Sequence, residues 1–178
     1  MSTTILPSKI ERVAVIDDDE QAREAMAESI VDADLRPIIQ RDRLNYLGDC
    51  IEKLRSDADA AVFDHRLKPR NYAAFQGAEA VAALYSIHFP ALLVTAWSTE
   101  DIDNIRPYRR KIPIMVRSGV LEPRIIREGI VQCLNEFEDT YVKERKPRRV
   151  LLRIDDVDSS FVFIIIPSWD YHTGLRLP

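Results

Sequence analysis

The sequence predicts an α/β fold: a five-stranded parallel sheet with helices on both faces, followed by a short β-rich C-terminal segment. Over residues 1–142, short apolar runs alternate with stretches whose apolar residues recur at helical spacing. Such alternation is typical of parallel sheets whose strands are joined by helices. After residue 149 the helical spacing stops, and strand-like runs follow one another directly. These observations define the fold class and separate the chain into two parts.

The five predicted strands are short apolar runs. The first, residues 13–16, leads into three consecutive aspartates, Asp17, Asp18 and Asp19. Two such charges about 4 Å apart repel by roughly 1 kcal/mol in water and by more near a protein interior, so a cation is expected among them. The other four predicted strands cover residues 36–40, 60–63, 91–94 and 112–116.

Between these runs, apolar residues at steps of three and four predict five helices. The first covers residues 20–31, and the last is a long helix with Pro123 in its first turn, a position that proline favours. A short helix before the last strand is expected to stop near Pro107. The apolar faces of the second to fifth helices are Leu44, Leu47, Ile51 and Leu54; Ala78, Val81, Leu84 and Tyr85; Ile102, Ile105 and Tyr108; and Ile126, Ile130, Cys133, Phe137 and Tyr141.

The residues that follow the strands carry the chemistry. In sheets of this class, ligands bind beyond the carboxyl ends of the strands. Those ends carry the side chains of Asp17, Asp18, Asp64, Thr95 and Arg117, which are expected to meet at one edge. Carboxylates suit a hard cation such as Mg²⁺, whereas a hydroxyl and a guanidinium suit phosphoryl oxygens. The set predicts a carboxylate that accepts a phosphoryl group, with Mg²⁺ as cofactor.

Over roughly residues 12–141, the sequence resembles the receiver domain of bacterial two-component response regulators, which has a flavodoxin-like fold. The resemblance rests on the order of the matching residues along the strands. The pair Asp17 and Asp18 follows the first strand, and Asp64 follows the third. A hydroxyl residue, Thr95, follows the fourth strand, and a basic residue, Arg117, follows the fifth.

The resemblance implies a role for each of these residues. Asp64 accepts a phosphoryl group from the phosphohistidine of a histidine kinase or phosphotransfer protein. Asp17, Asp18 and Asp64 bind Mg²⁺ together with the backbone carbonyl of Arg66. Thr95 bonds a phosphoryl oxygen and moves inward, and the last two helices and last strand transmit the change. The expected function is signalling, with no enzymatic activity beyond the domain's own phosphotransfer and dephosphorylation.

Three positions depart from the family pattern and open a second interpretation. Arg117 stands where the family has lysine, Ser118 where it has proline, and Ile114 where an aromatic residue is usual. Arginine keeps the charge but is bulkier and binds phosphate as a planar fork. The bond between Arg117 and Ser118 is expected to be trans, because a cis bond before a non-proline residue costs about 2.5–4 kcal/mol. The alternative is a receiver-like interaction module that works without phosphorylation, in which Arg117 pairs with Asp64.

A third interpretation is a Mg²⁺-dependent phosphatase of the haloacid dehalogenase type. The aspartates after the first strand would form its first motif, Thr95 its second, and Asp155 with Asp156 its late acidic pair. Two features weigh against it. Asp64 would have no role, and Lys111 is the only lysine suitably placed after Thr95.

Composition narrows the cellular setting. The 178 residues contain no apolar run long enough to cross a bilayer, and the N-terminus lacks the basic and apolar regions of a secretory signal. Cys50 and Cys133 lie far apart without metal-ligand spacing, as expected for reduced thiols in a cytoplasmic protein. The net charge of -4 disfavours non-specific binding to nucleic acid.

The C-terminal part is predicted to comprise a charged linker, residues 143–149, and a β-rich segment, residues 150–178. Two strands are expected, at 150–154 and 161–166, joined by a turn of Asp and Ser residues. A lone hairpin is marginally stable in water, and the apolar run 161–166 would promote association if exposed. The segment is therefore expected to dock on the first domain, to form a homodimer with a second copy, or to begin a larger β domain.

Overall fold

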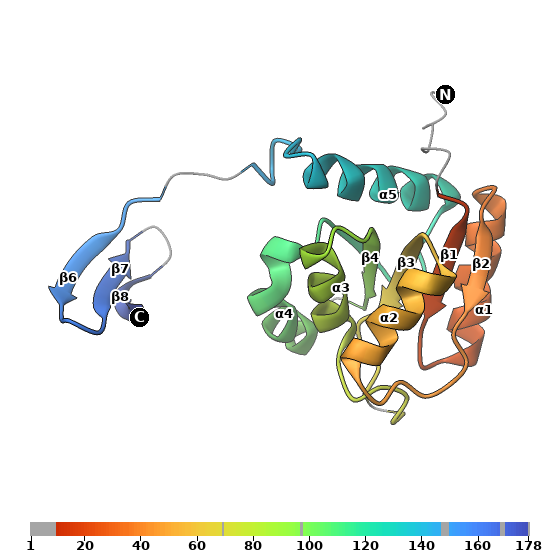
Figure 1. Cartoon of the computed structure of the whole chain (residues 1–178), viewed down its shortest axis with the longest axis horizontal. Coiled ribbons are helices and arrows are strands. Elements are labelled where there is room, and N and C mark those ends of the chain that lie inside the picture. The colour runs from red at the N-terminus through yellow and green to blue at the C-terminus, as the bar shows by residue number, and fades with distance from the viewer. Residues whose placement is uncertain (1–9, 69, 97, 147–149, 168–169, 178) are drawn as a thin grey trace. The chain divides into compact units, whose positions relative to one another are not determined.

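The computed structural model describes residues 10–68, 70–96, 98–146, 150–167 and 170–177. The chain divides into two units, Met1–Val142 and Lys143–Pro178, each of which is considered by itself (Figure 1). Residues 147–149 of the predicted linker lie outside the described residues.

The first unit contains the predicted five-stranded parallel sheet, with the strand order β2-β1-β3-β4-β5. Its strands are β1 (Arg12–Ile16), β2 (Arg36–Ile39), β3 (Ala60–Asp64), β4 (Ala91–Thr95) and β5 (Ile114–Arg117). All neighbouring pairs run parallel. β1 and β3, which precede the predicted acidic residues, are adjacent, and their carboxyl ends therefore lie side by side.

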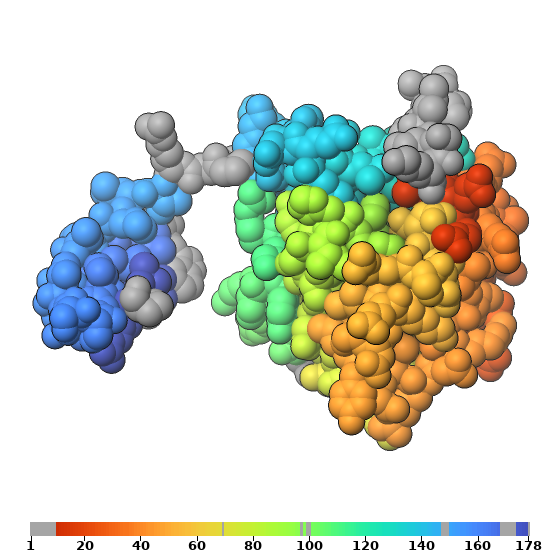
Figure 2. Space-filling view, viewed as in Figure 1, coloured from red at the N-terminus to blue at the C-terminus, as the bar shows by residue number. Residues whose placement is uncertain are grey.

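Helices cover both faces of this sheet, which confirms the predicted fold class. They are α1 (Glu20–Asp32), α2 (Leu47–Asp57), α3 (Gly77–Ser86), α4 (Thr99–Ile105) and α5 (Pro123–Phe137), with a 3-10 helix, η1 (Arg106–Lys111), after α4. Buried residues of α2, α3 and α4 pack on one face, and those of α1 and α5 pack on the other. Figure 1 shows α2 and α3 in front of the strands, and Figure 2 shows their side chains filling that face.

The end of β3 illustrates how the strand sequence positions a functional residue. Successive side chains of a strand point to opposite faces. Val62 accordingly packs on the side of α1 and α5, and Phe63 packs on the side of α2 and α3, both fully buried. Asp64 follows as the first residue of the strand that is partly exposed, so the strand leaves the core at the carboxylate.

Some element boundaries differ from the predictions. Leu44, predicted on the second helix, precedes α2; it is buried and pairs with Ala73 in an isolated parallel bridge. The helical pattern that reaches Tyr108 is divided between α4 and η1, because Pro107 has no N–H group for an α-helical hydrogen bond. Tyr141 lies beyond the end of α5, and β5 begins later than residue 112. Apolar periodicity alone does not define these ends.

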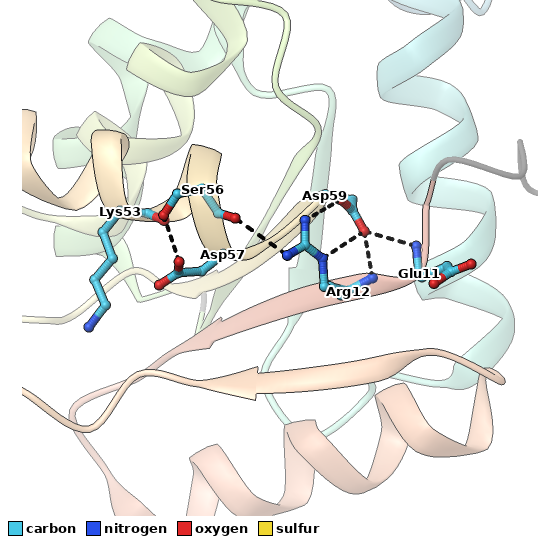
Figure 3. Close-up of polar contacts among 6 residues, drawn as sticks. All are labelled: Glu11, Arg12, Lys53, Ser56, Asp57 and Asp59. Atoms are coloured by element: carbon cyan, nitrogen blue, oxygen red, sulfur yellow. Dashed lines mark hydrogen bonds and ion pairs between the residues drawn. The ribbon is translucent and has the colours of Figure 1, made fainter.

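The amino ends of β1 and β3 are joined through Asp59 (Figure 3). Its Oδ2 accepts hydrogen bonds from the backbone N–H groups of Arg12 at 2.8 Å and Glu11 at 3.1 Å. Its Oδ1 accepts one from the Arg12 guanidinium at 3.0 Å, and the same guanidinium contacts the carbonyl oxygen of Ser56 at 3.4 Å. These bonds fix the alignment of the two strands at the edge opposite the predicted site.

The second unit is a three-stranded antiparallel sheet with the order β6-β7-β8. The strands β6 (Arg153–Val157) and β7 (Val162–Ile166) correspond to the two expected strands, although β6 begins later than predicted. β8 (Asp170–Leu177) adds a third strand. The register of β6 against β7 shifts between Ile154 and Asp156, which marks a β-bulge.

Two further sequence predictions concern single features. Cys50 on α2 and Cys133 on α5 are buried and reduced, as predicted. Among the residues that the structure describes, no helix is long and apolar enough to cross a membrane.

Candidate functional site

Three carboxylates meet at the carboxyl ends of β1 and β3. Asp17 and Asp18 directly follow β1, and Asp64 is the last residue of β3. One oxygen from each of these side chains lies within 4.8 Å of the other two. The structure therefore brings together the acidic residues that the sequence predicts to converge.

Burial makes it costly for this cluster to carry three negative charges. It is the largest cause that raises the pKa of Asp17 to about 7 and the pKa of Asp64 to about 6. The charge of Asp18 raises both values further. Hydrogen bonds act in the opposite direction: Asp17 Oδ1 accepts the backbone N–H of Asp19 at 2.7 Å, and Asp64 Oδ2 accepts that of Arg66 at 2.5 Å.

The donor set fits a hard divalent cation. Mg²⁺ prefers oxygen ligands and keeps part of its coordination for water or phosphate oxygens. A cation among the three carboxylates would offset the repulsion between them and reverse the rise in their pKa values. Asp17, Asp18 and Asp64 thus fit the predicted metal, while the role of the Arg66 carbonyl as a further ligand remains a prediction.

Asp19, the third of the consecutive aspartates, has a different role. Its side chain accepts the backbone N–H of Ala22 at 3.0 Å and caps α1. The Arg70 guanidinium lies 2.7 Å from Asp19 Oδ2 and 3.6 Å from Asp18 Oδ2. Because the Arg70 side chain is 59% exposed, this cation borders the cluster but stabilises it only weakly.

Arg23 is a buried cation beneath the site that the sequence analysis missed. Its guanidinium donates a hydrogen bond of 2.6 Å to the backbone carbonyl oxygen of Asp17 and lies 5.7 Å from the ring centroid of Tyr72. A signal was available in the sequence. Arg23 precedes Met26, Ala27 and Ile30 by three, four and seven positions, and therefore shares their buried face of α1.

Gly77, the first residue of α3, allows the helix to approach the carboxyl end of β3. A Cβ atom at this position would overlap the backbone carbonyl oxygen of Asp64. The Gly77 N–H donates to the carbonyl oxygen of His65 at 2.9 Å. A residue without a side chain is therefore required where α3 meets the end of β3.

Thr95 and Arg66 both contact Asp101, a buried residue of α4. Thr95 is the last residue of β4; it is buried, and its hydroxyl donates to Asp101 Oδ2 at 3.1 Å. Arg66 Nε donates to Asp101 Oδ1 at 2.7 Å. Since the Arg66 backbone N–H is bonded to Asp64, a continuous set of contacts connects Asp64, Arg66, Asp101 and Thr95.

No family model and no curated protein matches the sequence. Solved structures do match the first unit. A response regulator receiver domain from Clostridium thermocellum aligns with a TM-score of 0.54 at 13% identity, covering 72% of this chain and 98% of that chain. For a CheY-like receiver domain from Methanospirillum hungatei, the TM-score is 0.51 at 18% identity, with 73% and 98% covered.

The signal receiver domain of the putative response regulator NarL from Mycobacterium tuberculosis gives a TM-score of 0.52 at 18% identity, covering 71% of this chain and 98% of that chain. The first unit has the receiver fold. At these identities the likeness shows the fold alone, and the site has to carry the functional argument.

Arg117 stands at the end of β5 in this receiver fold, paired in register with Thr95 on β4. Its side chain is exposed, and among the described residues it forms no ion pair with Asp64. The pairing of Arg117 with Asp64, on which the non-switching interpretation draws, is therefore absent from this structure. The peptide bonds of the described residues are trans, as expected for the bond between Arg117 and Ser118.

Met115, rather than Ile114, borders Thr95 on the α4 side of the receiver fold. Ile114 packs on the side of α5, where a Cβ atom at Gly129 would meet its side chain. Met115 faces the opposite side and lines, with Thr95, a cavity of about 290 Å³. Successive residues of β5 point to opposite faces of the sheet, so Met115 and not Ile114 borders Thr95 on the α4 side.

The geometry weighs against the phosphatase interpretation. That interpretation leaves Asp64 without a role, whereas the structure joins Asp64 to the acidic cluster. Its late acidic pair lies on β6 of the second unit, where Asp155 accepts a hydrogen bond from Arg153 at 2.7 Å.

Proposed function

We propose that this chain is a response-regulator receiver that accepts a phosphoryl group on Asp64 from the phosphohistidine of a histidine kinase or phosphotransfer protein. The supporting observation is the convergence of Asp17, Asp18 and Asp64 at the carboxyl edge of the receiver sheet. The receiver fold makes a phosphoryl acceptor at this edge of the sheet expected. The three carboxylates supply the accepting oxygen and the ligands for Mg²⁺. A signalling partner is implied by the fold.

The proposed step is a displacement at phosphorus. A carboxylate oxygen of Asp64 forms the new P–O bond, the P–N bond to histidine breaks, and the imidazole leaves with the electron pair. Asp17, Asp18, Asp64 and the Arg66 carbonyl would hold Mg²⁺, which would supply positive charge to offset the negative charge that gathers there. With a pKa of about 6, Asp64 is mostly ionised at neutral pH and therefore available as the nucleophile.

Thr95 and Arg117 are the proposed partners of the phosphoryl oxygens. They stand opposite each other at the carboxyl ends of β4 and β5. The Thr95 hydroxyl supplies one donor, and the Arg117 guanidinium supplies a planar pair of donors that matches two phosphoryl oxygens. In the unmodified protein, Thr95 donates to Asp101 instead, so binding requires a rotation of its side chain.

The test uses beryllofluoride, which mimics an aspartyl phosphate, together with Mg²⁺. Amide NMR spectra of the wild-type chain should change around Asp64 and Thr95, whereas the Asp64→Asn variant should not respond. Asp49→Asn, an exposed substitution on α2, serves as the matched control and should respond like the wild type. A wild-type spectrum unchanged by beryllofluoride would overturn the proposal.

One observation favours a second candidate function, a receiver-like interaction module that works without phosphorylation. The Thr95 hydroxyl is already bonded within the protein, because it donates to Asp101 Oδ2 at 3.1 Å. This candidate requires partner binding that is unaffected by Asp64→Ala and by removal of Mg²⁺. Loss of partner binding under either change excludes it.

We propose a second copy of the chain as the partner of the second unit. In the sheet register, Ile164 is paired with Ile154 and Leu175, and Val162 is paired with Val157 and Leu177. Residues opposite each other across antiparallel strands share a face, so these six aliphatic side chains form one uncharged surface, here called the aliphatic face. On it, Ile154 is 63% and Val157 is 64% exposed.

The composition of the aliphatic face supports a dimer. An uncharged aliphatic surface is self-complementary in a two-fold dimer, because it brings no like charges together. Two copies of the aliphatic face stacked on each other would form a β-sandwich with a shared core.

A further inference from the structure

Asp101 is a buried carboxylate in the first turn of α4. Its side chain is 2% exposed. It also completes a capping box, in which the Ser98 hydroxyl accepts the Asp101 N–H at 3.1 Å and Asp101 Oδ2 accepts the Ser98 N–H at 3.2 Å. Asp101 therefore fixes the start of α4 as well as contacting the candidate site.

Two residues of the candidate site are bound to this carboxylate. The Thr95 hydroxyl donates to Asp101 Oδ2 at 3.1 Å, and Arg66 Nε donates to Asp101 Oδ1 at 2.7 Å. Arg66 also donates through its terminal nitrogen to the Ser98 hydroxyl at 2.6 Å. These hydrogen bonds hold the pKa of Asp101 below its usual value, although its burial acts in the opposite direction.

A phosphoryl group on Asp64 would compete for both of these partners. A threonine hydroxyl has a single proton, so Thr95 cannot donate to Asp101 and to a phosphoryl oxygen at the same time. Arg66 lies two residues beyond Asp64, and its guanidinium would be attracted by the added negative charge. Asp101, buried and charged, would lose hydrogen bonds that compensate its burial.

The surroundings of α4 leave room for this helix to shift when Asp101 loses its hydrogen bonds. The cavity of about 290 Å³ beside Thr95 is also lined by Ile102 and Ile105 of α4 and by Met115 of β5. Ile102 is 49% exposed, so α4 is not closely packed on this side. A short helix beside a cavity has room to shift when its first turn loses a hydrogen-bonded anchor.

We propose that Asp101 is a positioning residue that holds Thr95, Arg66 and the first turn of α4 together in the unmodified protein and releases them when Asp64 is modified. This inference rests on the proposed function, because it assumes a phosphoryl group on Asp64. Asp101 thereby opposes the modified state, and its removal favours that state. A residue with a purely structural role would do the reverse, since loss of its contacts would weaken ligand binding together with the fold.

The test measures the affinity of the full chain for beryllofluoride in the presence of Mg²⁺, by titration followed in amide NMR spectra. Asp101→Asn keeps the shape of the side chain and removes its charge. It should bind beryllofluoride about tenfold more tightly than the wild type, because one hydrogen bond to a charged group no longer has to be broken. Without beryllofluoride, the NMR signals of the α4 amides in Asp101→Asn should already lie closer to their positions in the beryllofluoride-bound wild type.

Asp103→Asn is the matched control. Asp103 lies on the same helix, its side chain is 65% exposed, and it pairs with Arg106 at the surface. It should bind beryllofluoride with wild-type affinity. If the wild type does not respond to beryllofluoride, the proposed function fails; if the wild type responds and Asp101→Asn binds equally or more weakly, the function stands and the role of Asp101 is overturned.

A measurement on the wild-type chain keeps the inference testable should Asp101→Asn fold poorly. Hydrogen exchange of the Ile102, Asp103 and Asn104 amides reports how firmly α4 is held. These amides should exchange several-fold faster with beryllofluoride and Mg²⁺ than with Mg²⁺ alone. Unchanged or slower exchange in the bound protein contradicts the release of α4.

Discussion

The guanidinium of Arg23 donates a hydrogen bond of 2.6 Å to the backbone carbonyl oxygen of Asp17. Both residues are buried, Arg23 on α1 and Asp17 at the end of β1, so the bond links the helix to the strand directly beneath the acidic cluster. If this donor is removed, the carbonyl oxygen stays buried without a hydrogen bond. The free energy needed to remove it from water is then no longer offset.

Arg23→Met should therefore lower the free energy of unfolding by about 1–3 kcal/mol, because the aliphatic chain replaces the packing but not the donor. Urea denaturation followed by circular dichroism measures this change. Arg55→Met, on the exposed face of α2, is the control and should change stability by less than about 0.5 kcal/mol. Equal effects of the two substitutions would mean that the contact with Asp17 contributes nothing.

Asp17 should make the metal-free protein less stable as the pH rises. Burial raises its pKa from 3.8 to about 7, so the folded protein binds this proton more tightly than the unfolded chain does. The resulting stabilisation is fully present below the unfolded value and is lost as the pH rises through about 7. From about pH 5 to about pH 8, the loss should amount to about 2–3 kcal/mol.

Urea denaturation in a chelator at both pH values tests this expectation. Asp17→Asn removes one of the two titrating groups, since the pKa of Asp64 is also raised, to about 6, and should therefore reduce the pH dependence. Asp34→Asn, an exposed substitution after α1, should leave it unchanged. Mg²⁺ affinity should weaken on acidification through the same range, because protons compete for the same oxygens. If the stability of the wild type falls no more between about pH 5 and about pH 8 than the stability of Asp17→Asn, the assignment is contradicted.

Gly77→Ala should damage both the fold and the site. The added methyl group would overlap the Asp64 carbonyl oxygen, so α3 or the end of β3 must move. A loss of about 1–3 kcal/mol in unfolding free energy is expected, together with weaker binding of Mg²⁺. Thermal denaturation and Mg²⁺ titration by NMR measure the two effects.

Gly48→Ala is the matched control, because no atom lies within 4 Å of a Cβ built at this position of α2. Replacing a helical glycine in open space should stabilise the protein by about 0.5–1 kcal/mol. The contrast in sign separates the close approach at Gly77 from the general effect of glycine in a helix. If both substitutions stabilise, α3 does not depend on this contact.

The sequence was sufficient to predict the sheet and its acidic edge because both follow from short-range rules. Apolar runs ending at Asp17 and Asp64 define buried strands, and parallel topology aligns their carboxyl ends. The helical pattern fails at Leu44, since an apolar residue in a loop can be buried by a distant partner such as Ala73.

The network around Thr95 was beyond the reach of sequence patterns for a different reason. Asp101 reads as an ordinary capping-box residue, and its contact with Arg66 joins positions far apart in the chain. Arg23 carried a periodic signal, but a charged residue on a buried face is more often read as an interruption of the pattern. Long-range polar contacts of this kind require coordinates.

The aliphatic face of the second unit should determine the oligomeric state. If two copies stack through it, Ile154→Lys places a charge in an apolar interface and should convert the dimer to a monomer, because a lysine buried there would have no partner. Asp156→Lys introduces the same residue on the same strand, paired with Phe163 on the opposite face, and should leave the dimer intact. Sedimentation of the full chain at tens of micromolar distinguishes the variants. A wild type that sediments as a monomer would refute the dimer. If the wild type is a monomer and Ile154→Lys also shifts NMR signals of residues in the first unit, the aliphatic face docks within one chain instead.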